Sequence, residues 1–426
     1  METGGQFERA QFNRAQMKTR SRGLDFLRGL AMVLVIMVHN ILHLNGESLA
    51  DTVVMTFTQA AIPCFFMASG ALALGAVHAG RREEMGPGAG LKGDINRASE
   101  QCRENGVCQE SGSRRESDIC RELQRTGVRF LRFYGTLTAW KVLYLLIYRS
   151  FGAPPPGNRD LLNYLFLFGD LPGVNTAHFW FMEAYLMILL LIPVLKALFH
   201  RERLLYLYLV GVLFVFENGL TSANFLVRLF CQFVLHKEPF LIGGFAEINP
   251  FHFQYSFALF YFLVGPLLYE KRESIPARKA ACCTAAGLIG LLLVRFSQYE
   301  TFRWQGLMVV AGHFWISTLF MAGGLFLLVT GGAAERLLEL PPVRAFSAIA
   351  GRNTEGIFYL HMPALVLLDQ VVYGRLFPGL ARFDCAALNF LESLAIAMAA
   401  GGLTFLFKRL RAGVIKKERG LLGHEQ

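Results

Sequence analysis

An arginine and a histidine inside one apolar segment are the residues best suited to do chemistry in this chain. The segment LDFLRGLAMVLVIMVHN carries Asp25, Arg28 and His39. In a helix, Asp25 and Arg28 are neighbours on one face, and His39, eleven residues after Arg28, returns to nearly that face after a rise of about 16 Å. A guanidinium binds anions and a neutral imidazole accepts a proton. The spacing therefore predicts an anion site and a general base on one stripe of a helix.

A structural role for the same residues stays open at this point. Arg28 at the end of a membrane helix fits a side chain that extends to lipid headgroups, and His39 fits a packed histidine with satisfied hydrogen bonds. Because burial of such groups in hydrocarbon costs at least a few kcal/mol each, function is the default reason to keep them there.

Two later apolar segments also contain titratable groups. AHFWFMEAYLMILLLIPVL carries His178 and Glu183, and NTEGIFYLHMPALVLL carries Glu355 and His361. Glu183 lies inside its apolar run and needs a buried partner. In neither segment does a histidine and carboxylate pair have metal-ligand spacing on one helix, so we expect no metal site.

Two further motifs have both a binding and a structural interpretation. Arg125, Arg129 and Arg132 precede an apolar run in VRFLRFYGTLTAWK, where they either bind phosphates or anchor the helix at the membrane surface. IPCFFMASGALAL places Ser69 and Gly70 in mid-membrane, where small residues usually serve helix packing.

Composition shows which elements must position these residues. The 426 residues are 54% hydrophobic and only 17% charged, with a mean hydropathy of +0.39, which excludes an ordinary water-soluble enzyme. The apolar runs are continuous and have the length of a bilayer-spanning helix, whereas the strands of membrane β-barrels alternate in polarity over roughly ten residues. We therefore expect an all-α integral membrane protein.

The charge distribution predicts the orientation of about ten transmembrane helices. Segments on the side of the N-terminus hold 32 Lys and Arg, and those on the other side hold 8. The positive-inside rule places both termini in the cytoplasm, and the net charge of +10 then reflects orientation rather than a nucleic-acid partner. The expected spans are residues 24–44, 54–79, 127–149, 178–199, 203–218, 253–270, 278–296, 305–330, 353–373 and 384–408.

The domain organisation follows from these spans. We expect a cytoplasmic N-terminal segment (1–23), a membrane domain (24–410) and a basic cytoplasmic tail (411–426), with residue 24 opening a retained span rather than a cleaved signal. Residues 80–125 are a polar cytoplasmic insert whose cysteines lack a CxxC pair, which favours a solvated linker over a zinc site. Residues 219–252 form an external, Phe-rich loop.

The first two apolar segments resemble the opening helices of acyltransferase family 3, a family of integral membrane proteins. LDFLRGLAMVLVIMVH meets the family's Arg-x10-His pattern with Arg28 and His39. IPCFFMASGALAL is similar to its Pro-x-Phe-Phe-x-x-Ser-Gly helix, which includes Ser69 and Gly70.

Four later segments extend the resemblance in the same order over most of the chain. The last of them has Met362 between His361 and Pro363, where the family usually has His-Pro, and the 80–125 insert is a second departure. The segments are VRFLRFYGTL, HFWFMEAYLMILLLIPVL, FALFYFLVGPLL and GIFYLHMP.

The resemblance implies acyl transfer, usually of acetyl from acetyl-CoA at the cytoplasmic face of the plasma membrane to a hydroxyl of a glycan or other envelope acceptor. Its partners would be acyl-CoA, that acceptor and membrane lipids, with no metal because a thioester is already activated. The expected catalytic residues are His39, Asp25, His178 and His361, with His39 acting as general base or carrying the acyl group itself and Asp25 orienting Arg28. The expected acyl-CoA-binding residues are Arg28, Arg129, Arg132 and Ser69.

Two other functions are compatible with the charges. A transporter or flippase for a lipid-linked or acidic solute would use the charged residues of the spans as a solute pathway, although the chain lacks detectable repeated halves. A solute-sensing or scaffold protein would use the basic insert and would leave His39 unexplained.

Overall fold

The helices that the structure describes divide into two units, one within residues 1–72 and 210–426 and the other within residues 73–209. The computed structural model describes residues 22–41, 49–75, 108–167, 169, 171, 173–174, 176–236, 256–305, 313, 315–376 and 386–422. Within these ranges the regular elements are all helical, and β structure is limited to one isolated bridge between Leu171 and Val174. Helices are expected because the bilayer core has no water to pair backbone groups.

Seven helices in the described ranges are long and apolar enough to cross a membrane, and eight if a pair bent by 60° at residue 331 is one span. They confirm a helical, multi-pass membrane architecture. The predicted number of about ten and the cytoplasmic placement of both termini stay predictions. The candidates are Arg22–Asn40, Thr52–Leu74, Trp180–His200, Arg203–Val227, Ala277–Arg295, Thr354–Leu376, Leu388–Ala412 and the bent pair Ile316–Thr330 with Gly332–Glu339.

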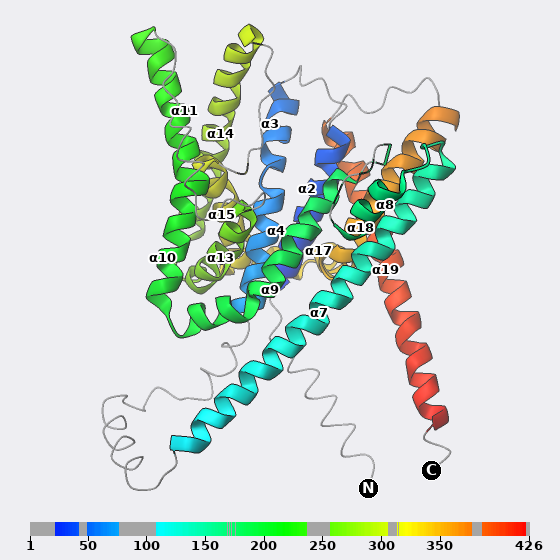
Figure 1. Ribbon diagram of the computed structural model, residues 1–426. Coiled ribbons are helices and arrows are strands. Elements are labelled where there is room, and N and C mark those ends of the chain that lie inside the picture. The colour runs from blue at the N-terminus through cyan, green and yellow to red at the C-terminus, as the bar shows by residue number, and fades with distance from the viewer. Residues whose placement is uncertain are drawn as a thin grey trace. The chain divides into compact units, whose positions relative to one another are not determined.

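Two boundaries differ from those predicted. Residues 108–125 of the insert are helical, because they form the first part of α7 (Cys108–Ser150), which Figure 1 shows as one uninterrupted helix. The span expected to end at residue 218 instead continues without a break to Leu235. Its α-helical parts join through π-helical turns, which accommodate the polar residues Glu217 and Asn218 in a buried position. The first part of the expected external loop is therefore helical.

The unit formed by residues 1–72 and 210–426 is organised around α2 (Arg22–Ile41). This helix packs against α4, α15, α18, α19 and η7. Its other elements are α3 (Leu49–Thr58), α4 (Ala61–Gly70), η3 (Phe214–Gly219), α11 (Leu220–Phe230), η4 (Cys231–Leu235), α13 (Ser256–Lys271), α14 (Ala277–Gln305), α15 (Ile316–Thr330), η6 (Gly332–Ala334), α16 (Glu335–Glu339), α17 (Pro341–Phe346), η7 (Ser347–Gly351), α18 (Thr354–Leu367), η8 (Leu368–Leu376) and α19 (Ala386–Leu422).

Glycines allow α4 and α13 to approach each other closely. A Cβ added at Gly70 would meet the backbone oxygen of Phe262, and one added at Gly265 would meet that of Met67. Small residues at such crossings are what membrane helices use to bring backbones together. The packing interpretation of Gly70 is therefore confirmed.

Among the described residues of the unit formed by residues 73–209, the principal helices are α7, α8 and α9. Its α9 packs against α7, and α8 contacts α7. The elements are α7, α8 (Asn158–Phe166), η2 (Ala177–Phe179) and α9 (Trp180–His200). Two elements contain the boundaries between the units, η1 (Ala71–Gly75) and α10 (Arg203–Leu213).

Candidate active site

Three of the candidate residues of the first unit, Asp25, Arg28 and His39, lie on α2, a helix in the interior of that unit. The spanning window of α2 is 67% buried, whereas that of α19 is 22% buried. Polar residues of α2 therefore face other helices rather than lipid. Asp25 and Asn40, near its two ends, are both 2% exposed.

Arg28 is held from two sides. Its Nη2 donates a hydrogen bond of 2.7 Å to Oγ1 of Thr354, the first residue of α18. Its Cζ lies over the ring of Phe65 on α4, 5.5 Å from the centroid. Both contacts depend on a planar guanidinium, which stacks on an aromatic face while its nitrogens donate in plane. The partly exposed Arg28 is thus held in a definite orientation by packing within the protein.

His39 lies against His361, with the ring centroids 5.3 Å apart and the planes inclined by 39°. His361 is fully buried, and its Nδ1 lies 2.6 Å from the carbonyl oxygen of Phe358. Since a carbonyl only accepts, this bond requires the proton on Nδ1 and leaves a lone pair on Nε2 in the neutral ring. The structure thus places the imidazole ring of His39 beside a second imidazole ring that keeps a lone pair on Nε2.

The two contacts show that Arg28 and His39 share a face of α2. Arg28 meets Thr354 near the start of α18, and His39 meets His361 further along that helix. The two helices therefore run parallel, and the stripe predicted from the spacing faces α18. This helix continues past Met362 and Pro363 to Leu367, so the departure from His-Pro does not end it.

Asp25 accepts a hydrogen bond from Nε of Arg352 at 3.2 Å, as part of an ion pair. Arg352 follows the π-helical turn η7, which packs against α2. The pair joins the start of α2 to the start of α18. That Asp25 also orients Arg28 stays a prediction.

The remaining predicted site residue of this unit, Ser69, lies on α4 in a mostly buried position. It directly precedes Gly70, the residue in close contact with α13. Its place in the acyl-CoA site stays a prediction.

His178, Arg129 and Arg132 belong to the second unit. His178, on η2, is buried among aromatic rings, and its Nε2 lies 3.2 Å from the hydroxyl of Tyr144. Arg129 and Arg132 are exposed on α7. The packing accounts for the position of His178, and its catalytic role stays a prediction.

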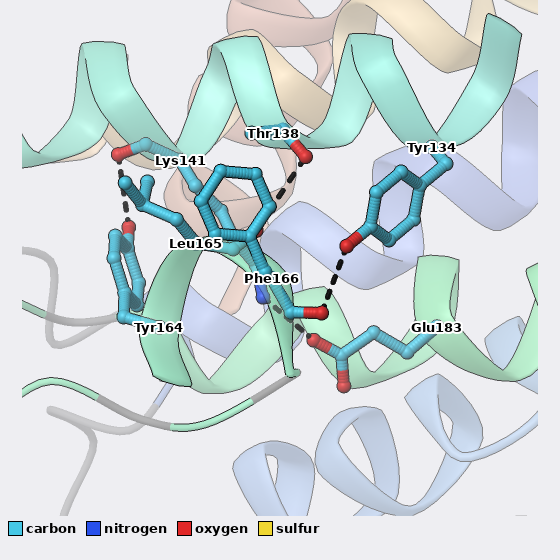
Figure 2. A network of polar contacts seen from close by, with 7 residues as sticks. All are labelled: Tyr134, Thr138, Lys141, Tyr164, Leu165, Phe166 and Glu183. Carbon is cyan, nitrogen blue, oxygen red and sulfur yellow. Dashed lines mark hydrogen bonds and ion pairs between the residues drawn. The ribbon is translucent and has the colours of Figure 1, made fainter. Parts of the chain in front are cut away.

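The second unit also contains a buried ion pair. Lys141 on α7 donates to Oε1 of Glu183 on α9 at 3.1 Å, and the two side chains are 3% and 12% exposed. The hydroxyl of Tyr164 donates to the carbonyl oxygen of Lys141 at 3.0 Å, and Figure 2 shows these groups between the two helices. The prediction that Glu183 needs a partner is confirmed.

The comparisons with known proteins bear on the chain as a whole. The model of a family described as an acyltransferase domain, Acyl_transf_3, matches residues 21–409. The chain belongs to acyltransferase family 3. No curated protein and no solved structure matches it.

Family membership shows that this chain is a multi-pass membrane acyltransferase. It favours the enzyme over the transporter and the scaffold. Both Arg28 and His39 fall within the matched region. Among the residues that the structure describes, no group of three or more His, Cys, Asp or Glu could hold a metal ion.

A group of polar residues on α19, close to the end of α2, was not predicted from the sequence. Asn40 donates from Nδ2 to Oε2 of Glu392 at 2.7 Å, and Asn389 and Ser393 are buried on the same helix. The sequence could have indicated them, because Glu392 is a carboxylate within a predicted span and such a residue is a candidate functional residue. Arg352 could not be singled out from the sequence, because it lies between two predicted spans in a short basic segment.

Proposed function

We propose that this acyltransferase moves an acetyl group from acetyl-CoA, at the cytoplasmic face of the plasma membrane, to a hydroxyl of a glycan or other cell-envelope acceptor. The observation that carries the proposal is the pairing of Arg28 and His39 on one face of α2, both directed at α18. Eleven residues of helix separate the two groups by about 16 Å. A long, thin pantetheine arm fits that separation between an anionic end and a reactive thioester.

Arg28 is proposed to bind a phosphate of CoA. The guanidinium keeps five donors in a rigid fork that matches phosphate oxygens, and Thr354 and Phe65 fix its plane. That Arg129 and Arg132, exposed on α7, also bind acyl-CoA stays a prediction. Ser69 is proposed to contact the same cosubstrate.

His39 is proposed as the general base. It takes the proton of the acceptor hydroxyl while the oxygen attacks the thioester carbon, and the C–S bond then breaks to release CoA, whose sulfur receives a proton. His361, with its lone pair on Nε2, is proposed to assist this proton movement. Asp25, paired with Arg352, is proposed to hold the end of α2 that carries Arg28.

The proposed function has a direct test in cells. Mass spectrometry of envelope glycans and small glycolipids, with and without this gene, is expected to show a species heavier by one acetyl group only when the gene is present. A strain that produces the His39→Gln protein should resemble the strain without the gene. An identical set of acetylated species in all three strains would contradict the proposal.

A conservative substitution tests the role of Arg28. Arg28→Lys keeps the charge but loses the planar fork, and hydrogen bonds to charged groups contribute about 1.5–3 kcal/mol. We expect KM for acetyl-CoA to rise by about tenfold or more. The measurement is the rate at which purified protein releases free CoA thiol from acetyl-CoA.

The matched control is Arg22→Lys on the same helix. Arg22 is 62% exposed in a 3.9 Å ion pair with Glu339, so its substitution should leave KM for acetyl-CoA nearly unchanged. If Arg28→Lys keeps the wild-type KM as well, the guanidinium does not bind CoA through its fork.

A further inference from the structure

The start of α19 carries a cluster of polar side chains on one helical face. Glu392 and Ser393 follow Asn389 by three and four residues, which places each of them beside Asn389 on the helix. Asn389 is 2% exposed and Ser393 is fully buried. Glu392 reaches α2 through its hydrogen bond with Asn40, the residue that follows His39.

Three atoms of this cluster are buried without a hydrogen-bond partner in the part of the chain that the structure describes. They are Oδ1 of Asn389, Oε1 of Glu392 and Oγ of Ser393. Natural proteins pair nearly all buried polar groups because an unpaired one is costly. Three such atoms within one helical turn therefore indicate a site where something else supplies the hydrogen bonds.

The conformation of Ser393 supports this inference. Serine and threonine inside helices usually bond back to the carbonyl oxygen four residues earlier, and Thr404 on the same helix does so with Ala400 at 2.8 Å. Thr330 and Ser347 do the same elsewhere in this unit. The Ser393 hydroxyl does not, so it keeps its donor and acceptor capacity for another partner.

The cluster lies at the His39 end of the candidate site. Near the start of α19, Glu392 meets Asn40 at the end of α2, whereas Lys408, sixteen residues later, donates to Asn353 beside the start of α18. Thus α19 runs antiparallel to both α2 and α18. Arg28 and the expected CoA phosphates are at the Lys408 end, and the cluster is at the end with the base.

The chemistry of the cluster specifies the ligand. Two of the three atoms, an amide oxygen and a carboxylate oxygen, only accept hydrogen bonds, and the third is a hydroxyl. They require a ligand with several O–H donors, and the Glu392 carboxylate disfavours an anionic group such as phosphate. A neutral sugar, with adjacent hydroxyls of fixed geometry, meets these requirements.

We propose that Asn389, Glu392 and Ser393 bind hydroxyl groups of a neutral sugar acceptor and hold another of its hydroxyls toward His39. This inference rests on the proposed function. Asn40 is a positioning residue, because its amide fixes the Glu392 carboxylate from the helix that carries the base.

The test uses the full chain in lipid nanodiscs, methyl β-D-glucoside as the acceptor and acetyl-CoA labelled in its acetyl group. Asn389→Leu and Ser393→Ala each remove a hydrogen-bonding group at nearly constant shape. We expect each to raise KM for the sugar by about tenfold and to leave KM for acetyl-CoA unchanged. Thr404→Val on the same helix is the matched control and should change neither constant.

Thermal stability separates ligand binding from a structural role. Replacing a buried polar group that has no partner by an apolar one is neutral or stabilising, so the variants should melt at or above the wild-type temperature without sugar. Unchanged sugar KM in both variants would overturn the inference.

Failure of the proposed function gives a different result. If the wild-type protein consumes no acetyl-CoA, the sugar site is tested by binding alone. The melting temperature of the wild-type protein should then rise on addition of methyl β-D-glucoside. Loss of this rise in Asn389→Leu and Ser393→Ala supports the sugar site. No increase, or an equal one in the variants, overturns it.

Discussion

Replacing His39 by glutamine is expected to abolish measurable acyl transfer while the protein still inserts and still binds CoA. Glutamine is similar in size and can hydrogen-bond, but it cannot take a proton from a hydroxyl. Loss of a positioned general base costs about 100- to 10,000-fold in rate. Arg28 lies about 16 Å away along the helix, so the proposed phosphate contact should survive.

The measurement is the rate of label transfer from acetyl-CoA, with CoA affinity and melting temperature determined on the same protein. Wild-type turnover by correctly inserted His39→Gln protein would show that the residue only packs. His361→Gln and His178→Gln should lose less activity. Of the two we expect the larger loss for His361, because its ring lies against that of His39, whereas His178 is bonded to Tyr144 in the other unit.

Local periodicity was sufficient to predict the arrangement on α2. Eleven residues are close to three helical turns, so any helix through residues 25–39 places Arg28 and His39 on one stripe, and both contact α18 in the structure. The need of Glu183 for a partner also followed from sequence, because an unpaired carboxylate is costly among apolar side chains. Lys141, a charged group inside another predicted span, is that partner.

Local periodicity could not predict which distant segments of the chain pack against each other. His39 and His361 are 322 residues apart, and nothing in either segment indicates that their helices pack in parallel. The same holds for Asp25 and Arg352, which meet because η7 packs against α2. Helix ends were also missed where π-helical turns carry a helix through polar residues such as Glu217 and Asn218.

The buried pair of Lys141 and Glu183 gives the second large effect, on stability. Lys141→Met leaves the Glu183 carboxylate without this ammonium in a site where both side chains are almost inaccessible to water. Breaking a buried pair on one side costs about 3–5 kcal/mol, a large part of the stability of a typical protein. We expect a marked fall in the melting temperature of the purified protein, and Glu183→Leu should act similarly by leaving the ammonium buried.

The double variant and an exposed pair show whether burial causes the effect. Lys141→Met with Glu183→Leu removes both charges, and buried pairs replaced by apolar residues are often neutral in stability, so much of the loss should be recovered. Lys196 donates to Glu122 at the shorter distance of 2.7 Å, but these side chains are 25% and 28% exposed, and its ammonium lowers the pKa of the Glu122 carboxyl. Lys196→Met should cost about 1 kcal/mol or less because water replaces the partner. Equal losses for Lys141→Met and Lys196→Met would mean that burial does not set the strength of the Lys141–Glu183 pair.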